Sequence, residues 1–290
     1  FAPNNQAFGA VNLSSLSDSA VRNILRYHIF QTENFRFSKQ VTSGPNEMSS
    51  VLPNNLVWLN VPRVGEVYVN GTPVLRADIP ATNAVIHEIG AVLVPPTKTM
   101  YQIIAETPSL SRFRQMANTR PDLASPNQAF IAGAVSLRQT LKSTRFQGTT
   151  TAAGTASTIF AGQNLTIFVP NDAAFDAVGL TDSTAAASFI NSVSGQRIVN
   201  HHLSGVSGRL FAKGLTPGGL PTFVAGRPVN ILLEGGGVVI NRKSLVGGVE
   251  LPGDPIDLAN GFNNANVVTA DILATNGVIH IINRPLKPEN

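Results

Sequence analysis

The chain has five histidines, the residue type most often used as a general base or metal ligand near neutral pH: His28, His87, His201, His202 and His280. A metal site or a catalytic site would also need carboxylates, or the other histidines, to converge on the same point. No nucleophile elbow, phosphate-binding glycine loop or His-Glu-x-x-His helix accompanies them. We therefore expect no catalytic residue, no metal site and no cofactor.

The acidic residues that stand out are Asp78 and Asp271, because each precedes an isoleucine in an Ala-Asp-Ile triplet. They could act as an acidic pair only if the two triplets faced each other. The triplets belong to longer stretches, residues 77–89 and 270–282, which are identical at ten of thirteen positions. Residues 1–8 and 168–175 form a second pair and share five of eight residues. A repeat this far apart indicates two copies of one globular domain.

Three segments recur in the same order in both halves: a Phe-x-Pro-Asn-x-x-Ala-Phe opening, a central Tyr27-His28-Ile29 or His201-His202-Leu203, and a closing Asn-x-Val-Ile-His strand. They resemble the signature segments of the fasciclin (FAS1) family over nearly the whole chain. The resemblance implies an α+β fold of two FAS1 domains, each a β-sandwich or wedge of mostly antiparallel strands with a layer of short helices. It also implies an extracellular adhesion or matrix module, closer to fungal or plant fasciclin-like secreted proteins than to animal ones.

In the family pattern, His28 and His202 belong to the central motif, whereas His87 and His280 belong to the closing strand. Their recurrence in both halves favours packing and hydrogen bonding within each core. In animal members an Asp-Ile pair before the closing strand is implicated in integrin recognition, and it corresponds here to Asp78, Ile79, Asp271 and Ile272. The residues that flank these pairs differ from the animal motif. The structural alternative is that the aspartate caps a turn while the isoleucine fills the core.

The elements that must position these residues follow from local patterns. Asn4 and Asn171 are placed to cap short helices, and apolar spacing predicts a helix over 19–27 and another over 185–202. Glu66 to Val74 alternates around Asn70-Gly71 and predicts a hairpin. The closing hairpin has Asn276-Gly277 in one half and Asn83-Ala84 in the other. If this position is left-handed, Ala84 costs about 1 kcal/mol.

The domain boundary is expected near residue 97, giving domains 1–97 and 98–290. A helical pattern over 101–117, split by Pro108, opens the second domain, which also carries a Thr/Ala/Gly-rich loop near 146–163. The first repeat has no counterpart of these helices. We therefore expect residues upstream of Phe1 in the native protein.

Composition is consistent with a folded protein: 290 residues, 43% hydrophobic and 13% charged, with a net charge of +4 and no cysteine. No Lys/Arg run indicates nucleic-acid binding, and no apolar run is long enough for a transmembrane segment. Three Asn-x-Ser/Thr triplets are candidate N-glycosylation sites at Asn12, Asn70 and Asn164.

Three functions from different classes remain open. The first is a secreted or cell-surface adhesion module of the matrix or cell wall, which binds polysaccharide or glycoprotein, or associates with itself, through its tandem domains. The second is a carrier of a small apolar ligand or lipid, which would need an apolar cavity. The third is a polysaccharide-active enzyme that uses an acidic pair. The resemblance favours the first, a non-enzymatic role.

Overall fold

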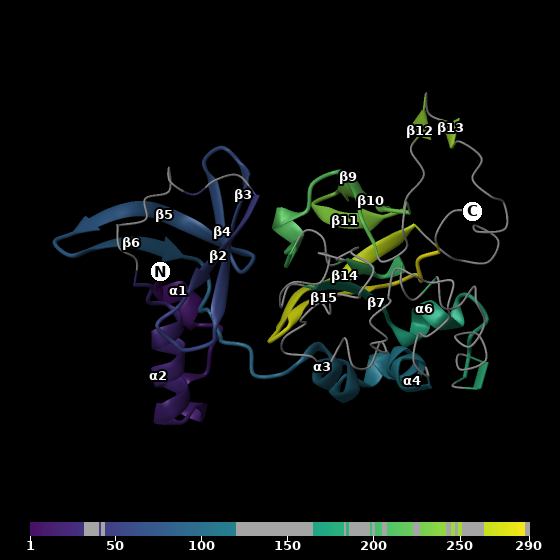
Figure 1. The fold of residues 1–290 in the computed structure, drawn as a ribbon, viewed down its shortest axis with the longest axis horizontal. Helices are drawn as coiled ribbons and strands as arrows, with labels where there is room; N and C mark the ends of the chain where they lie inside the picture. Colours follow the sequence, from purple (N-terminus) through teal and green to yellow (C-terminus); the bar gives the residue numbers. More distant parts are fainter. Residues whose placement is uncertain are drawn as a thin grey trace, which may run out of the picture. The chain divides into compact units, whose positions relative to one another are not determined.

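The computed structural model describes residues 1–31, 41, 44–119, 165–182, 184–185, 198, 201–204, 208–222, 227–241, 245–246, 249–250 and 264–287. The chain separates into two compact units (Figure 1). The first consists of Phe1–Thr97 with Leu210–Leu215, and the second of Lys98–Arg209 with Thr216–Asn290. Each unit combines a β-sheet with short helices, so the predicted α+β class is confirmed.

The first unit begins with β1 (Ala2–Pro3), α1 (Asn5–Phe8), the 3-10 turn η1 (Leu13–Ser15) and α2 (Asp18–Tyr27). Its sheet continues with β2 (Gly44–Ser49), β3 (Leu56–Arg63), β4 (Glu66–Val69), β5 (Thr72–Ala81) and β6 (Ala84–Ile89). The strand order is β1-β6-β5-β4-β3-β2, with β1 parallel to β6 and the other pairs antiparallel. The predicted hairpin is confirmed: Asn70 and Gly71 form the turn between β4 and β5, with positive φ values of 47° and 78°.

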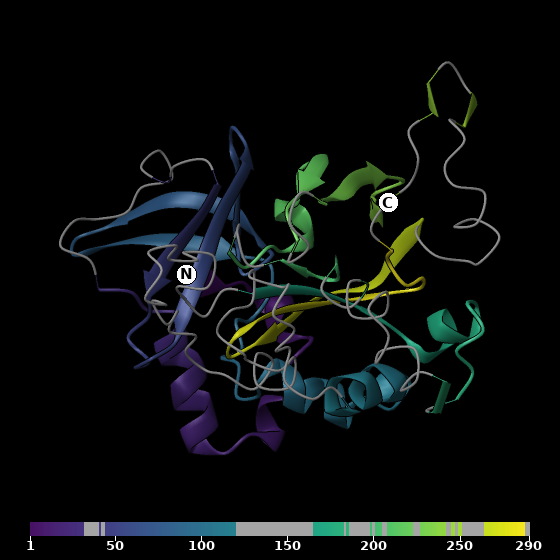
Figure 2. The ribbon, with the colours of Figure 1, turned by 45° about the vertical axis from the view of Figure 1, so that its right-hand side comes forward.

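The second unit opens with α3 (Met100–Glu106), the 3-10 turn η3 (Pro108–Leu110) and α4 (Ser111–Thr119), so the predicted helical segment split at Pro108 is confirmed. Its sheet has the order β8-β7-β15-β14-β11-β10-β9. The bounds are β7 (Leu165–Pro170), β8 (Leu203–Ser204), β9 (Gly218–Leu220), β10 (Val229–Glu234), β11 (Gly237–Ile240), β14 (Ala265–Ala274) and β15 (Gly277–Ile282). Figure 2 shows β14 and β15 side by side in yellow.

Further short elements are α6 (Asp172–Asp176), the 3-10 turn η6 (Ala212–Gly214) and the hairpin strands β12 (Leu245–Val246) and β13 (Val249–Glu250). The two predicted caps are confirmed, because the side chain of Asn4 accepts the N–H of Ala7 and that of Asn171 accepts the N–H of Ala174, both at 2.9 Å. Most of the predicted helix over 185–202, and the loop at 146–163, lie outside the described residues.

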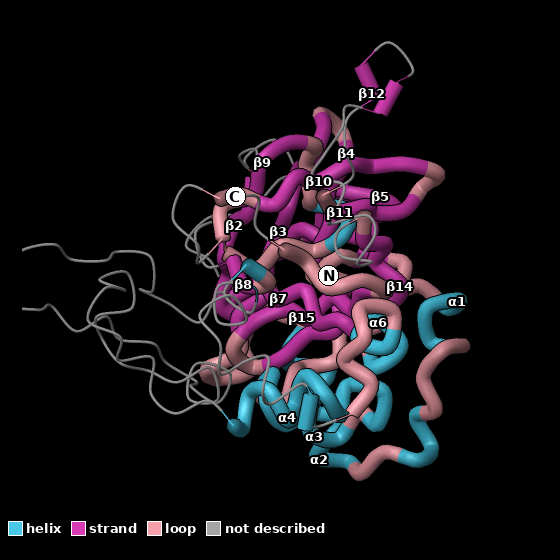
Figure 3. Tube along the Cα trace, turned by 90° about the vertical axis from the view of Figure 1, so that its right-hand side faces the viewer, coloured by secondary structure: helices cyan, strands magenta, loops and turns pink. Residues whose placement is uncertain are grey.

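Each unit has its own apolar core. In the first unit the core comprises Tyr27, Val57, Leu59, Val69, Ile89 and Leu93. In the second unit helices α3 and α4 pack against the sheet, which Figure 3 shows as cyan helices beneath the strands of β7 and β15. Met100 and Ile104 of α3, Leu110 of η3 and Phe113 of α4 form one core cluster with Leu165, Ile167 and Ile279 of the strands. The described part of the first unit has no helices corresponding to α3 and α4.

The expectation of a left-handed residue at Ala84 and Gly277 is wrong. Both residues are the first of a strand, and neither has a positive φ. The glycine is required for a different reason: a Cβ at Gly277 would lie 2.3 Å from the carbonyl oxygen of Leu165 and 2.9 Å from the sulfur of Met100. Close approach of the neighbouring backbone, rather than turn geometry, therefore explains this glycine.

Candidate functional site

The Asp-Ile pairs lie at the same irregularity in both units. The pairing of β5 with β6 shifts register between Arg76 and Ile79, and that of β14 with β15 shifts between Thr269 and Ile272. Asp78 and Asp271 stand at these β-bulges with φ of 60° and 62°. Aspartate tolerates the left-handed region better than most side chains do, since its short polar group interacts with nearby backbone. The aspartates therefore shape bulges within long strands and do not cap turns.

The closing-strand histidines hold these bulges. The backbone N–H of Asp78 donates to Nδ1 of His87 at 3.3 Å, and the backbone N–H of Asp271 donates to Nδ1 of His280 at 3.3 Å. Because Nδ1 accepts in both cases, it carries no proton in this arrangement. The aspartate carboxylates lie slightly farther away, with Oδ1 to Nδ1 distances of 3.8 Å and 3.9 Å. Each histidine thus fixes an aspartate backbone in position.

Each histidine also packs on the phenylalanine of the opening motif. His87 lies 5.3 Å from the ring of Phe1, and His280 stacks on Phe168 at 5.4 Å. The aspartate side chains stay partly open to solvent, 30% exposed at Asp78 and 28% at Asp271, while Ile79 and Ile272 are half-buried. The structure therefore brings the predicted Asp-Ile and closing-strand histidine residues together, with a carboxylate at the surface of each unit.

The central-motif histidines, His28 and His202, each bond two backbone groups, one before and one after them in the chain. His28 Nδ1 bonds to the carbonyl of Ile24 at 2.7 Å, while its Nε2 accepts the N–H of Leu93 at 2.9 Å. His202 bonds in the same way to Ile198 at 2.8 Å and Leu286 at 2.9 Å. A carbonyl can only accept, so Nδ1 carries the proton and the ring is neutral. Burial lowers the pKa of His28, and it lowers the pKa of His202 to about 4.

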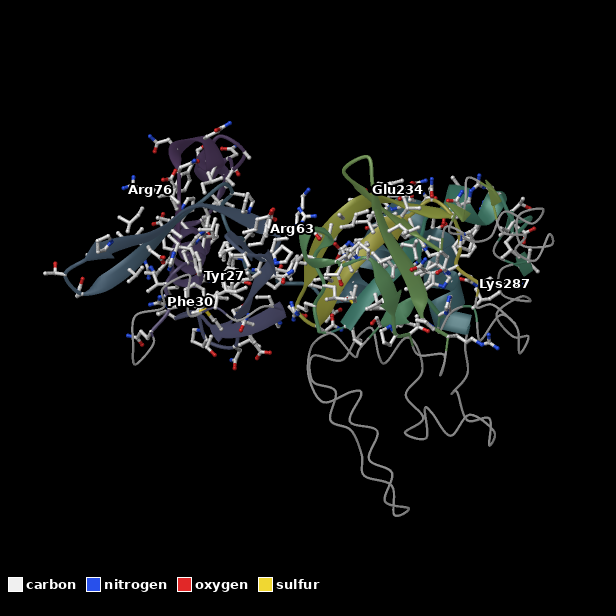
Figure 4. All side chains as sticks on the ribbon, turned by 90° about the horizontal axis from the view of Figure 1, so that it is seen from above. Tyr27, Phe30, Arg63, Arg76, Glu234 and Lys287 are labelled. Carbon is white, nitrogen blue, oxygen red and sulfur yellow. The ribbon has the colours of Figure 1, made fainter. Side chains whose placement is uncertain are left out.

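Asn70, at the turn after β4, and Asn241, directly after β11, form a contact that the sequence patterns did not reveal. Asn70 accepts the N–H of Trp58 at 2.9 Å and donates to the hydroxyl of the buried Tyr27 at 2.9 Å (Tyr27 is labelled in Figure 4). Asn241 accepts the N–H of Asn230 at 2.7 Å, and its amide nitrogen lies 3.3 Å from His201 Nε2. His201 takes the place of Tyr27 in the second unit's central motif, and like Tyr27 it contacts the asparagine side chain. The sequence signal that could have indicated this contact is that each asparagine ends an alternating run, as Asn70-Gly71 and Asn241-Arg242.

The three glycosylation triplets have different surroundings. Asn12 is exposed, and its Oδ1 accepts the hydroxyl of Ser14 at 2.7 Å. Asn70 is half-buried, and its amide nitrogen, the atom that would carry a sugar, is directed at Tyr27. Asn164 lies outside the described residues. Asn12 is therefore the accessible one of the two described acceptors.

Within the described ranges, no cluster of three or more His, Cys, Asp or Glu side chains could hold a metal ion. None of the helices in that part of the chain is both long and apolar enough to span a bilayer. The first unit contains a pocket of about 620 Å³. Apolar residues of β6 and of the segment after α2 line it, including Ile29, Phe30, Val85 and Ile86. This pocket was not predicted from the sequence.

Comparison with known proteins agrees with the duplicated motifs. A model of the Fasciclin domain matches residues 1–95 and 141–288. Stabilin-1 of Mus musculus is 30% identical and Stabilin-1 of Homo sapiens 28% identical over 105 residues. Each match spans 33% of this chain but 4% of the relative.

Among solved structures, a FAS1 domain pair from the insect cell adhesion molecule Fasciclin I is 22% identical, with a TM-score of 0.41. That match covers 98% of this chain and 86% of the other. The Fasciclin domain model, by contrast, matches most of the chain in two regions that each contain all three repeated motifs. The chain therefore belongs to the fasciclin domain family.

Proposed function

We propose that this chain is an extracellular adhesion module, with two domains at 1–97 and 98–290, that binds a cell-surface or cell-wall polysaccharide or glycoprotein without catalysis. The observation that carries the proposal is the duplicated Asp-Ile bulge. Asp78 and Asp271 have nearly the same φ, the same histidine contact and the same partly exposed carboxylate. Two copies of one binding surface raise avidity, because the second contact is intramolecular.

The carboxylates are the adhesive groups in this proposal, and the histidines are positioning residues. Removing the charge without moving the backbone tests this division. Asparagine keeps the tolerance for positive φ that aspartate has. The variants are therefore Asp78→Asn, Asp271→Asn and the double substitution, each compared with the unchanged chain for binding to an array of matrix and cell-wall polysaccharides and glycoproteins.

Each single substitution is expected to weaken binding, and the double substitution to weaken it by more than either single change. A charge-dependent contact should also fade as salt rises from about 0.01 to 1 M, because the screening length falls from about 30 to 3 Å. As a matched control, Asp18→Asn removes a carboxylate from the exposed first turn of α2. Unchanged binding of the double variant would show that adhesion does not use these carboxylates.

The pocket of the first unit favours a second candidate, the carrier of a small apolar ligand. Its volume of about 620 Å³ is within the range of small-molecule sites, roughly 300–1,000 Å³. Native mass spectrometry of the protein purified from its own source tests this candidate. A co-purified apolar molecule that is lost in Ile86→Asp would support it, since Ile86 lines the pocket.

A further inference from the structure

The Asp-Ile bulge is the second of two bulges on its strand, and this holds in both units. β5 has an extra residue at Leu75 and β14 has one at Val268, and at each of these positions the pairing with the next strand shifts register. Asp78 and Asp271 stand at the second shift, three residues later. Bulges re-aim side chains and often lie next to functional sites. Residues 75–78 and 268–271, which run from the first bulge to the second, are called the bulge strips below.

The first bulge of each strip exposes a large aliphatic side chain. Leu75 is 55% exposed and Val268 is 52% exposed. Neither belongs to the core cluster of its unit. The second unit contains α3, α4 and the whole of β7, and Val268 is exposed in their presence. The exposed aliphatic position therefore recurs in a unit whose sheet is covered by helices.

Fold stability does not account for an aliphatic residue at this bulge. A single exposed apolar residue is ordinary at a protein surface, but here the same kind of residue recurs at the same bulge of both repeats. The bulge would form equally well with a polar side chain, because the extra residue belongs to no core cluster. An exposed aliphatic side chain stabilises a structure only when another apolar group covers it. Leu75 and Val268 therefore favour contact with an apolar group of a partner.

The charge of the strips indicates what else the partner carries. The carboxylates of Asp78 and Asp271 are 30% and 28% exposed. In the second unit the residues between the bulges, 269–270, are uncharged. In the first unit Arg76, labelled in Figure 4, lies opposite Glu88 of β6, so these two charges offset each other. The aspartate is thus left as the net charge of each strip, and it attracts a cation.

We propose that each bulge strip binds a polypeptide segment of another protein in which a lysine or arginine lies close to an aliphatic residue. The cation contacts the carboxylate at the second bulge, and the aliphatic group covers Leu75 or Val268 at the first. Three residues along a strand span about 10 Å, so one segment reaches both bulges. An acidic polysaccharide would be repelled by the carboxylates, and a neutral one brings no charge to them. This inference rests on the proposed function, because it uses the same carboxylates, and it chooses protein as the partner class.

The experiment measures binding of the full chain to beads that display synthetic hexapeptides at high density, so that both strips engage one bead. The hexapeptides consist of glycine and serine except at two positions. One position is lysine, serine or aspartate, and the next position but one is leucine or serine. Beads that carry a neutral glucan or polygalacturonate form the polysaccharide arm of the test.

Three double variants separate the roles of the residues. Leu75→Ser with Val268→Ser, the serine variant, removes the aliphatic contacts. Asp78→Asn with Asp271→Asn, the asparagine variant, removes the charge. Val64→Ser with Leu233→Ser is the matched control, since it removes one exposed apolar side chain from each unit outside the strips. Circular dichroism checks that each variant is folded.

The unchanged chain and the control should bind most tightly to the peptide that contains both lysine and leucine. The serine variant should bind this peptide about tenfold more weakly, because the leucine no longer covers an aliphatic side chain. The asparagine variant should lose the preference for lysine over serine. High salt should reduce the preference for lysine but not the preference for leucine, because only the charged contact is screened.

Three results would overturn the proposal. The first is equal binding of the unchanged chain to the lysine and leucine peptide and to the peptide with serine at both positions. The second is a folded serine variant that binds the lysine and leucine peptide as tightly as the control does. The third is binding to a polysaccharide that the asparagine variant loses and the serine variant keeps. That third result would support adhesion through the carboxylates while excluding a protein segment as the partner, so the two proposals can fail separately.

Discussion

At the level of single residues, the same polar contacts recur in both units. Each has an aspartate at positive φ whose N–H donates to a strand histidine, and each has a neutral histidine that joins a helix carbonyl to a distant backbone N–H. These bonds satisfy backbone groups that would otherwise be left without partners at a bulge or in a loop. These histidines therefore bond backbone groups in each unit, and the two buried ones, His28 and His202, should make stability depend on pH.

The first prediction concerns the strained aspartate. Asp271→Ala should lower the free energy of unfolding by about 1–2 kcal/mol, because alanine at a φ of 62° has the steric cost without the polar side chain. Asp271→Gly should cost less, since glycine adopts this conformation freely. Urea unfolding of the two variants checks the order. Greater stability of the alanine variant would show that the bulge is not conformationally strained.

The second prediction concerns pH. The folded pKa of His202 is about 4, below the ordinary value of about 6.5 for an unfolded chain. Between these values the unfolded state binds more protons, so stability is complete above pH 6.5 and falls as the pH drops toward 4. The shift corresponds to about 3 kcal/mol. Burial of His28 lowers its pKa too and acts in the same direction.

Urea unfolding at pH 7 and pH 4.5 measures this dependence. His202→Gln should be less stable than the unchanged chain at pH 7, because the bonds to Ile198 and Leu286 are disturbed. It should lose less stability on going to pH 4.5, because it lacks the titrating group. The same loss in both proteins would mean that His202 does not control the acid response.

The third prediction concerns glycosylation. Asn12 should carry a glycan when the chain is expressed in a eukaryotic secretory pathway, whereas Asn70 should not, because its amide nitrogen is bonded to Tyr27 inside the first unit. Mass spectrometry of glycopeptides distinguishes the two sites. A fully glycosylated Asn70 in folded protein would contradict the contact with Tyr27.

At the level of elements, the closing hairpin of the second unit, β14 and β15, is held by contacts with α3 and β7. In the second unit Asn276, at the turn between β14 and β15, accepts the first N–H of α3 from Met100 at 2.9 Å. Thr99 caps the same helix through a reciprocal pair of bonds with Gln102. The hairpin therefore contacts both α3, through Asn276, and β7, through β15. Gly277 leaves room for the backbone of β7.

The fourth prediction tests this packing. Gly277→Ala should destabilise the second unit by about 1–3 kcal/mol, because its methyl group would collide with the backbone of Leu165, which cannot easily move. Gly237→Ala is the matched control: Gly237 also begins a strand, and its new Cβ would meet only the carbonyl of Glu234, at 3.6 Å. Thermal unfolding of both variants gives the comparison. Equal melting temperatures would refute the close-approach explanation.

At the scale of the whole molecule, the two units share their repeated contacts but differ in how many apolar side chains their described residues expose. Among the described residues, β7 pairs with all six residues of β15, and β1 pairs with Glu88 and Ile89 of β6. Of the exposed large apolar residues among those described, most belong to the first unit: Leu25, Ile29, Val64, Leu75, Ile86 and Val94.

The fifth prediction follows from this difference. Backbone amides of residues 84–87 should exchange with deuterium faster than those of residues 277–280, because local opening is easier where a strand has fewer packed neighbours. Hydrogen exchange with mass spectrometry on the unchanged chain measures both segments at once. Equal protection of the two segments would mean that the edge of β6 is covered in solution.

Several features could be predicted from the residues alone: the duplication, the family, the helix caps at Asn4 and Asn171, the hairpin at Asn70-Gly71 and the helix break at Pro108. These features depend on neighbouring residues, and a short motif or a local backbone preference encodes them. The repeated stretches also contain both partners of each Asp–His contact: Asp78 with His87, and Asp271 with His280. The sequence did not reveal that each aspartate sits in a bulge and contacts its histidine.

Contacts between segments far apart in the chain could not be predicted and become visible in the folded protein. The reason for Gly277 depends on Leu165, and the role of Asn70 depends on Tyr27. The pocket of the first unit is lined by residues of β6 and by the segment after α2, which are far apart in the chain. Register and close approach arise when distant strands pack, and no local pattern specifies them. Sequence therefore identified the kind of domain, and packing showed which distant residues meet within each unit.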